Sequence, residues 1–554
     1  MGEPDIARGS SADPPTRDAW WRGGVLYQIY PRSFVDSNGD GHGDLQGVID
    51  RLDHLAWLGV DGIWLSPITP SPDADWGYDV SDFTSVDPDF GDLDRLDRLV
   101  VEARERGIHV VLDLVPNHTS DRHAWFVDAR TDRSARRRDW YVWADPKPDG
   151  SPPNNWRSTF GGSAWTLDRG TGQYYLHNFL AEQPDLNWWN DEVRDAFDRI
   201  LRWWFDRGID GFRIDVANGL VKDRELRDNP LVTDEDHPRV TSQELRPVYN
   251  MNRDEVHDVF RRWRAIAETY DPPRLLLGET WVLEIDNLMR FFGESGDELQ
   301  LIMNFPFVFA EPGAGLRSVV AATEAALPSG TWPAWSGSNH DVGRFPTRWC
   351  RGDERKIRAS LFVMLTLRGT PLLYYGDEIG MTDVEVPRER LRDPVGVRGW
   401  PDEPGRDGAR TPMQWTPETD GGFTRAGVEP WLPVGDTASC NVADQLDDPR
   451  SMLHLCRDLI ALRRDRPDLR SGGSSVVGSP DEAWVWRRGH DTVVAVNDSE
   501  LPIDAPLERG RILIGTDRER DDDEVDGSIR LDPWEAVVVA LGPEGARGAD
   551  EAAP

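Results

Sequence analysis

The chain has 554 residues and 38% of them are hydrophobic, which is enough to build a large core and favours more than one domain. Its 63 basic and 99 acidic residues give a formal net charge of −36 at pH 7. Because that charge repels polyanions, nucleic acid is excluded as an expected partner, and a small neutral or cationic ligand is favoured.

Cysteine usage and the absence of apolar segments indicate the expected compartment. The three cysteines, an odd number, do not supply a disulfide framework. Residues 1–20 lack the apolar segment of a secretory signal, and no apolar run reaches the ~18 residues that a membrane-spanning helix needs. We therefore expect a cytoplasmic protein, a monomer or homodimer that binds no membrane, with disordered tails at 1–18 and 544–554.

Short apolar runs alternate with amphipathic helical stretches over most of the chain, which is typical of a parallel sheet with crossover helices. Eight strands in this order predict an α/β fold of the TIM (β/α)8 barrel type, whose chemistry lies at the carboxyl ends of the strands. The predicted strands are 25–30, 62–66, 109–115, 211–216, 275–279, 299–305, 335–339 and 371–375.

Two connections are too long for ordinary loops between strand and helix, which have ~2 to 6 residues. One follows the third strand and predicts an inserted subdomain; the other, 378–448, follows the eighth strand and is expected to overhang the same face. After a helix at 452–464, short alternating runs such as TVVAVN predict an antiparallel β-domain. The predicted domains are the catalytic barrel at 19–118 and 190–468, the inserted B subdomain at 119–189 and the C-terminal β-domain at 469–543.

Charged residues follow the apolar residues of the fourth and fifth strands. In GFRIDVA, alternation along the strand puts Arg213 and Asp215 on one face and Phe212 on the other. An arginine beside a carboxylate holds it ionised and oriented, as a nucleophile requires, although a structural ion pair has the same pattern. The fifth strand, RLLLGET, is apolar until Glu279, which is either an acid catalyst or an ordinary glutamate at a strand end.

The third and seventh strands also end in polar residues. LDLVPNH presents Asp113, Asn117 and His118, and SGSNHD presents His340 and Asp341. Carboxylates that attack and protonate, together with donors that hold sugar hydroxyls, suit glycoside hydrolysis. Phosphoryl transfer is disfavoured because the chain has no G-x-x-x-x-G-K-[ST] phosphate-binding loop.

The segments DLVPNH, GFRIDVA, GET and SNHD, in this order, resemble the four signature regions of glycoside hydrolase family 13, the α-amylase family. GVDGIWLSP and GTPLLYYGDEIGM add to a resemblance that covers roughly 20–540. It implies a retaining mechanism with Asp215 as the nucleophile, Glu279 as the acid/base and Asp341 as the stabiliser of the transition state. It also implies that the scissile glucosyl unit is bound by His118, Arg213, His340, Asp75 and Tyr78, the last two in DWGYD, where Trp76 departs from the family pattern.

Within that family, QPDLNW with Gln183 is similar to the α-glucosidase and oligo-1,6-glucosidase group. The resemblance implies that Arg410, in ARTPMQW, closes the pocket behind a terminal glucose, and that Phe160 lines it, although core packing explains an aromatic residue equally well. These motifs favour exo action on short substrates and disfavour an endo-amylase. Val216 after the nucleophile indicates α-1,6 cleavage, whereas the following ANGL favours α-1,4 cleavage, and we expect the latter.

Two further hypotheses for the function remain open at this point. A transglucosylase or isomerase, such as a trehalose synthase or a sucrose-acting enzyme, uses the same carboxylates but excludes water from the second step. A non-catalytic sugar-binding relative is expected to lose the carboxylates, which are intact here.

The sequence DSNGDGHGD begins like a calcium-binding loop, with oxygen ligands at positions 1, 3 and 5 and glycine at position 6. The twelfth position is Gly47, which excludes a true EF-hand and leaves a solvated turn as the alternative. The resemblance implies a structural Ca²⁺ or Mg²⁺ site, and no organic cofactor is expected. Its ligands would be Asp36, Asn38, Asp40, the carbonyl of His42, and Asp44.

Overall fold

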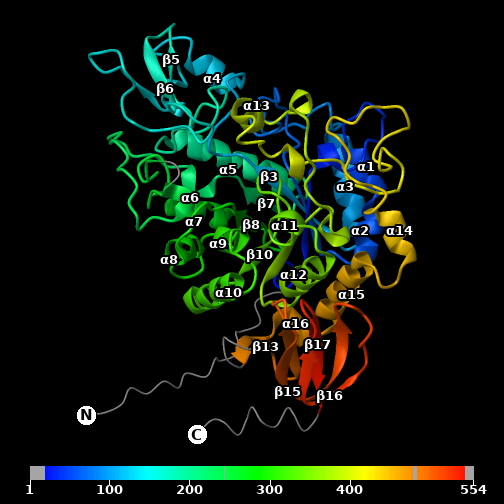
Figure 1. Cartoon of the computed structure of the whole chain (residues 1–554). Helices are drawn as coiled ribbons and strands as arrows, with labels where there is room; N and C mark the ends of the chain where they lie inside the picture. Colours follow the sequence, from blue (N-terminus) through cyan, green and yellow to red (C-terminus); the bar gives the residue numbers. More distant parts are fainter. Residues whose placement is uncertain (1–18, 242–243, 478–482, 543–554) are drawn as a thin grey trace, which may run out of the picture.

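The computed structural model describes residues 19–241, 244–477 and 483–542. The two predicted tails, residues 242–243 of the predicted barrel, and residues 478–482 and 543 of the predicted β-domain lie outside these residues. Figure 1 shows a barrel surrounded by helices, with a β-domain at one end and an irregular layer at the other. Within the described residues, no helix combines the length and the apolar character that crossing a bilayer requires.

Eight parallel strands form a nearly closed barrel in the order β10-β11-β1-β2-β3-β7-β8-β9. Each lies within or next to a predicted strand, so the predicted barrel is confirmed. The strands are β1 (Leu26–Ile29), β2 (Gly62–Leu65), β3 (His109–Leu114), β7 (Gly211–Ile214), β8 (Leu275–Gly278), β9 (Leu301–Ile302), β10 (Ala334–Ser336) and β11 (Thr370–Tyr374).

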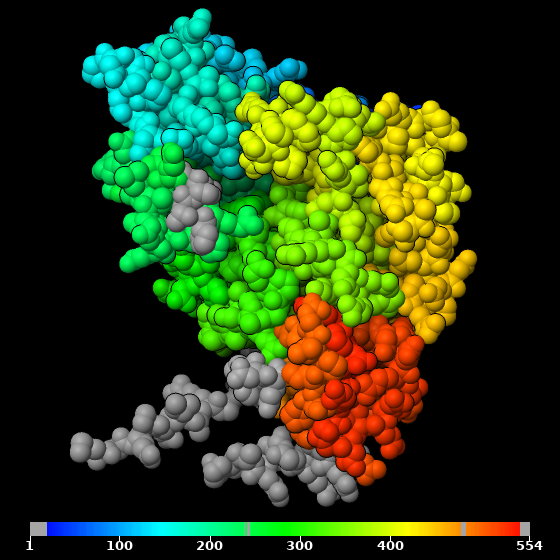
Figure 2. Space-filling model, in the orientation of Figure 1, coloured from blue at the N-terminus to red at the C-terminus, as the bar shows by residue number. Residues whose placement is uncertain are grey.

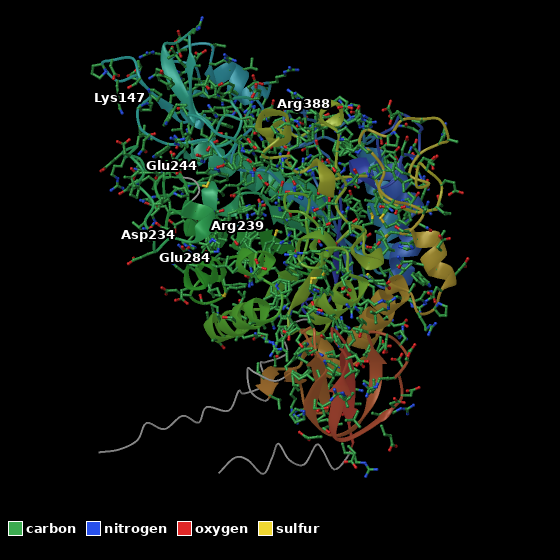
Figure 3. The ribbon with its side chains drawn as sticks, viewed as in Figure 1. Lys147, Asp234, Arg239, Glu244, Glu284 and Arg388 are labelled. Carbon is green, nitrogen blue, oxygen red and sulfur yellow. The ribbon has the colours of Figure 1, made fainter. Side chains whose placement is uncertain are left out.

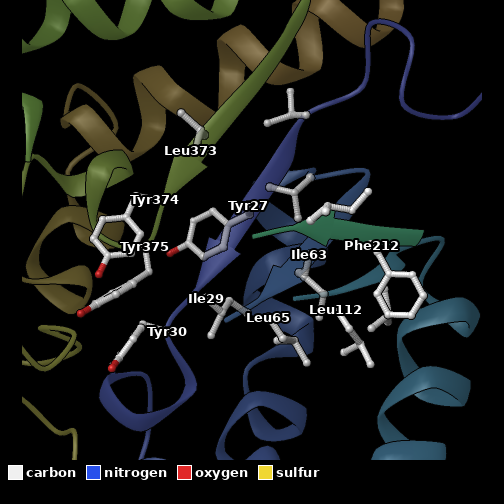
Figure 4. Close-up of a cluster of buried hydrophobic side chains, with 14 of the residues drawn as sticks. Tyr27, Ile29, Tyr30, Ile63, Leu65, Leu112, Phe212, Leu373, Tyr374 and Tyr375 are labelled. Atoms are coloured by element: carbon white, nitrogen blue, oxygen red, sulfur yellow. The ribbon is translucent and has the colours of Figure 1, made fainter. Parts of the chain in front are cut away.

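Alternate residues of each strand enter two different cores. Figure 4 shows the outer one, where Tyr27, Ile63, Leu112 and Phe212 lie together between strands and helices. Leu26 and other neighbouring strand residues instead join a cluster inside the barrel. Because Phe212 faces the helices, the next residue along β7 faces the barrel interior.

Helices cover the outside of the barrel, and several begin at a side chain that accepts a backbone N–H, as helix starts require. Asp92 caps α3 in this way, Asn190 caps α5 and Asp353 caps α12. The helices outside the inserted segment are α1 (Leu45–Asp50), α2 (Leu52–Leu58), α3 (Leu93–Glu105), α5 (Asp191–Asp206), α6 (Pro238–Thr241), α7 (Val256–Ala267), α8 (Ile285–Met289), α9 (Phe305–Val308), α10 (Ala314–Ala326), α11 (Phe345–Arg348), α12 (Glu354–Thr366), α13 (Pro394–Gly399), α14 (Val442–Asp447), α15 (Met452–Asp465) and α16 (Pro467–Ser471).

The segment after β3 forms its own small layer. It holds α4 (Ala124–Ala129) and a three-stranded antiparallel sheet in the order β4-β6-β5, with β4 at Trp143–Ala144, β5 at Trp165–Asp168 and β6 at Gln173–Leu176. Figure 2 shows this segment, in cyan, beside the yellow-green part of the 378–448 excursion. In Figure 3, Lys147 of the first segment and Arg388 of the second both lie at the end of the molecule away from the β-domain.

The C-terminal part is a six-stranded antiparallel sheet in the order β12-β13-β14-β17-β15-β16. It matches the alternating runs seen in the sequence, and the predicted antiparallel β-domain is confirmed. Its strands are β12 (Ser474–Val477), β13 (Trp484–Arg488), β14 (Thr492–Val496), β15 (Ile503–Gly515), β16 (Glu524–Leu531) and β17 (Ala536–Leu541).

Candidate active site

Arg213 lies at the centre of a cluster of carboxylates at the carboxyl ends of β3, β7 and β8. Its side chain is fully buried, and Nη1 lies 2.8 Å from both Asp113 Oδ1 and Asp215 Oδ1. Nη2 lies 2.8 Å from Glu279 Oε1. One guanidinium therefore holds the side chains of three neighbouring strands in a fixed arrangement.

Strand register explains why these side chains meet. Asp113 of β3 is paired with Arg213 of β7, and Arg213 with Leu277 of β8. Paired residues on adjacent strands project to the same face, so Asp113 and Arg213 both point into the barrel. Asp215 follows β7 by one residue and Glu279 follows β8 by one residue, which brings both to the same rim.

Glu279 is oriented by two further donors. Its Oε2 accepts from the backbone N–H of Val216 at 3.0 Å, and its Oε1 accepts from the indole N–H of Trp281 at 3.1 Å. Val216 has a φ of 44°, a left-handed conformation that a β-branched residue rarely adopts. Strain of this kind is typical of functional sites, and here it presents the Val216 N–H to the carboxylate.

Asp341, the third carboxylate of the site, lies among cationic and hydrogen-bonding groups. Its carboxylate lies 3.0 Å from His340 Nε2, 2.9 Å from Arg406 Nη1 and 3.1 Å from Arg410 Nη2. Gln28 donates to His340 Nδ1 at 2.7 Å, so the His340 proton is on Nε2, and burial lowers the pKa of that ring to about 4. Burial also works to raise the pKa of Asp341, but His340 and the two arginines outweigh it and hold that pKa well below its usual range.

Burial raises the pKa of Asp113 to about 7 and raises the pKa of Asp215 well above its usual value, while the Arg213 guanidinium opposes both shifts. Ionised Asp215 therefore depends on Arg213.

Tyr78 also belongs to this cluster and donates its hydroxyl to Asp113 Oδ2 at 3.1 Å. The Tyr78 ring lies parallel to that of His340, with 5.2 Å between their centroids.

The far end of the site is built around Arg406, which the sequence analysis did not single out. Its guanidinium lies 2.7 Å from Asp75 Oδ1, 2.7 Å from Asp393 Oδ1 and 2.9 Å from Asp341 Oδ1. It also lies over the ring of Phe160, 5.3 Å from the centroid. The signal that could have found it is the first of the two arginines in GRDGARTPMQW, four residues before Arg410.

The remaining expected residues lie beside this end. Gln183 donates to Asp75 Oδ2 at 3.1 Å and lies 3.1 Å from His118 Nε2. Arg410 is fully buried and donates to the His340 carbonyl at 2.8 Å, whereas Arg406 lies between Asp75 and Asp341. All eleven expected catalytic and sugar-binding residues thus belong to one contiguous cluster.

The 36–44 loop is closed by hydrogen bonds among its own groups. Asp36 accepts from the backbone N–H of Gly39 at 2.6 Å, and Asp44 caps α1 through Gly47 at 2.7 Å. The donor set is oxygen, as calcium prefers, but these carboxylates face N–H groups. Across the part of the chain that the structure describes, no group of three or more His, Cys, Asp and Glu side chains is placed to hold a metal ion. The other expected ligands, Asn38, Asp40 and His42, lie on the same loop, where Asp40 accepts from the His42 backbone N–H.

A buried arginine that joins two rim carboxylates, with a third carboxylate opposite, defines a carboxylate-based site of the kind found in glycoside hydrolases. A model of the alpha amylase catalytic domain matches residues 28–472, and the chain belongs to this family, glycoside hydrolase family 13. The resemblance drawn from the motifs is confirmed, and with it the prediction of a glycoside hydrolase.

Relatives match over nearly their whole length. The chain is 42% identical to a probable alpha-glucosidase of Rhizobium meliloti, covering 96% of this chain and 98% of that protein. It is 37% identical to an oligo-1,6-glucosidase of Heyndrickxia coagulans, covering 94% and 99%. Among solved structures, the alpha-glucosyl transfer enzyme XgtA is 40% identical with a TM-score of 0.89, and the trehalulose synthase MutB is 31% identical with a TM-score of 0.86. Both cover 95% of this chain and 100% of their own.

Proposed function

We propose that this protein is a retaining, exo-acting α-glucosidase that releases glucose from the non-reducing end of short gluco-oligosaccharides. The observation that carries the proposal is the Arg213 guanidinium, which holds the carboxylates of Asp215 and Glu279 at 2.8 Å each on its two terminal nitrogens. Carboxyl groups held this close favour retention, for which a separation of ~5 to 5.5 Å is typical.

The proposed reaction is a double displacement. Asp215, ionised beside Arg213, attacks the anomeric carbon while Glu279 gives its proton to the departing glycosidic oxygen. Glu279 then takes a proton from water, which attacks the same carbon and releases Asp215. Asp341, whose pKa His340 and two arginines hold low against burial, supplies negative charge beside the oxocarbenium-like transition state.

Exo action follows from the closed far end of the site. Arg406 joins Asp75 to Asp341 and packs over Phe160, so no room remains there for a second glucosyl unit. On its other side, Arg406 and Asp341 border a cavity of about 440 Å³ that Trp400 also lines. Neither Asp215 nor Glu279 lines that cavity, so it lies outside the catalytic cluster.

The relatives named alpha-glucosidase and oligo-1,6-glucosidase do not decide which glycosidic linkage this chain cleaves. We propose a preference for α-1,4 links. Incubation with maltose, isomaltose and sucrose, followed by ¹H NMR of the anomer released first, tests this. The proposal requires α-glucose as the first product and faster release from maltose. First release of β-glucose contradicts retention, and faster release from isomaltose contradicts the linkage.

A transglucosylase is the second candidate, favoured by the likeness to XgtA and to the trehalulose synthase MutB. The two activities differ in whether water or another acceptor takes the glucosyl unit in the second step. With sucrose or maltose as the only substrate, a hydrolase releases free glucose as its main product. Accumulation of a new disaccharide instead identifies the transferase.

We propose that the 36–44 loop binds a structural Ca²⁺, with Mg²⁺ as the alternative ion, through the oxygens expected from its sequence. The support is the concentration of acidic side chains on one tight glycine-containing loop. Since the loop precedes α1, which Asp44 caps, the ion would stabilise the fold and take no part in the reaction. Isothermal titration of chelator-treated protein with CaCl₂ and with MgCl₂ tests it.

We further propose a cytoplasmic protein that works as a monomer or homodimer and binds no nucleic acid. The three cysteines are free thiols, which suits a reducing compartment. The net charge of −36 opposes polyanion binding. Light scattering on the purified protein gives the oligomeric state directly.

A further inference from the structure

Lys222 is one of three lysines in the chain, and its side chain is only 3% exposed. Its Nζ lies 2.6 Å from Asn117 Oδ1, 2.8 Å from Asp185 Oδ2 and 3.2 Å from the Leu220 carbonyl. An ammonium group offers three N–H donors and no acceptor, so each of its neighbours must present an oxygen. A buried ion pair adds little to stability, so the main effect of this lysine is to orient the groups that it contacts.

The lysine fixes the amide of Asn117. If that amide turned over, its NH₂ would face the ammonium of Lys222 and two donors would meet. With Oδ1 held toward Lys222, Asn117 Nδ2 lies 3.1 Å from Nδ1 of the next residue, His118. An amide NH₂ only donates, so Nδ1 of His118 must accept.

The proton of His118 is therefore on Nε2. That nitrogen lies 2.9 Å from the Tyr78 carbonyl, which can only accept, and this contact favours the same tautomer. Burial lowers the pKa of His118, so the ring is neutral. Gln183 Nε2, which donates to Asp75, lies 3.1 Å from His118 Nε2, and since both groups donate in this tautomer, the contact between them is not a hydrogen bond.

We propose that Lys222 is a positioning residue that orients Asn117 and thereby holds His118 as the Nε2–H tautomer. Asp185, which comes from the return of the inserted segment, balances the lysine charge. The same contact ties that segment to the barrel, since Asp185 also forms a β-bridge with His118. In this tautomer the one N–H of His118 is directed to the Tyr78 carbonyl and fixes Tyr78 beside the glucose site, a role that rests on the proposed function.

The test is the ¹⁵N NMR spectrum of the full-length enzyme labelled with [¹⁵N]histidine. Ring ¹⁵N shifts distinguish the two neutral tautomers, and the signals of His118 among the 11 histidines are assigned with His118→Gln. The wild type should show protonated Nε2 and unprotonated Nδ1. Asn117→Asp, whose carboxylate can only accept, should move the proton to Nδ1.

The double variant Lys222→Met/Asp185→Asn removes both buried charges together, so that neither is left unpaired. The Asn117 amide is then free to turn over, so the ring ¹⁵N shifts of His118 should lie between those of the two neutral tautomers. The matched control is Lys356→Met/Glu500→Gln, which removes a surface ion pair of 2.6 Å and should leave the His118 signals unchanged. Wild-type His118 shifts in the folded Asn117→Asp variant overturn the proposal, and so do wild-type shifts in a folded Lys222→Met/Asp185→Asn variant.

Kinetics separate this inference from the proposed function. Loss of the hydrogen bond from His118 Nε2–H to the Tyr78 carbonyl, which helps to place Tyr78 beside the glucose site, should raise KM for maltose about three- to tenfold in Asn117→Asp, with a smaller change in kcat. If the tautomer changes as expected and KM does not, the positioning role of Lys222 stands. In that case the proposed contribution of His118 to sugar binding is wrong.

Discussion

The replacement of Arg213 by methionine tests the electrostatics of the site most sharply. Burial raises the pKa of Asp215, and the Arg213 guanidinium at 2.8 Å is the largest influence that lowers it. Without that charge the pKa of Asp215 rises further, so the ionised nucleophile is lost at a higher pH. Activity of Arg213→Met should therefore fall at neutral pH and partly recover as the pH increases.

The size of the effect follows from the contact distance. An opposite charge within ~4–6 Å lowers a carboxyl pKa by about 1–3 units. Each unit corresponds to about 1.36 kcal/mol, so the loss is about 1.4–4 kcal/mol, or about 10- to 1,000-fold in ionised nucleophile below the new pKa. The assay is kcat/KM for p-nitrophenyl α-glucoside across the pH range in which the variant stays folded.

Arg213→Lys is the matched control for charge. It keeps a cation but loses the planar guanidinium that joins Asp215 to Glu279. The acidic limb of its pH profile of kcat/KM should therefore lie between those of the wild type and Arg213→Met. Removing one partner of a buried ion pair costs about 3–5 kcal/mol of stability, so circular dichroism must show that each variant is folded. A folded Arg213→Met enzyme with the acidic limb of the wild type would refute this reasoning.

Three further outcomes follow from the same geometry. Glu279→Gln should slow maltose hydrolysis much more than release of p-nitrophenol, because a good leaving group needs little protonation; equal losses would contradict its role as the acid. Arg406→Ala should raise KM for maltose at least about tenfold, since it removes a charged donor beside Asp75 and Asp341, and an unchanged KM would exclude Arg406 from the glucose site. EDTA should lower the thermal unfolding temperature, and added CaCl₂ should restore it, if the 36–44 loop holds a cation; no change in either direction argues for a solvated turn.

The barrel could be predicted because its strands are short apolar runs bounded by polar residues at one end. Asp215 and Glu279 were found for the same reason: each is the first carboxylate after a buried strand, and neighbouring strands end at the same rim. Pairing along the strands then brought Asp113 to Arg213. At these positions the local sequence pattern indicated the same residues that the contacts between strands bring together.

Arg406 was missed because its only local mark is its position four residues before Arg410. It lies in an irregular excursion with many arginines, and its partners Asp75 and Asp341 are 331 and 65 residues away along the chain. Lys222 escaped notice for the same reason: a single lysine after an apolar stretch gives no sign that Asn117 and Asp185 surround it. Contacts of this kind depend on how loops fold over the barrel, which strand periodicity does not determine.

The proposed mechanism requires Asp215 to form a covalent bond to the glucosyl unit. Incubation with 5-fluoro-α-D-glucosyl fluoride, followed by proteolysis and mass spectrometry, tests this directly, because a fluorinated glucosyl unit is transferred to the nucleophile and leaves it slowly. We predict inactivation and a single labelled peptide that carries one fluoroglucosyl unit on Asp215. A label on any other residue, or an active enzyme that turns the reagent over without becoming labelled, would contradict the account.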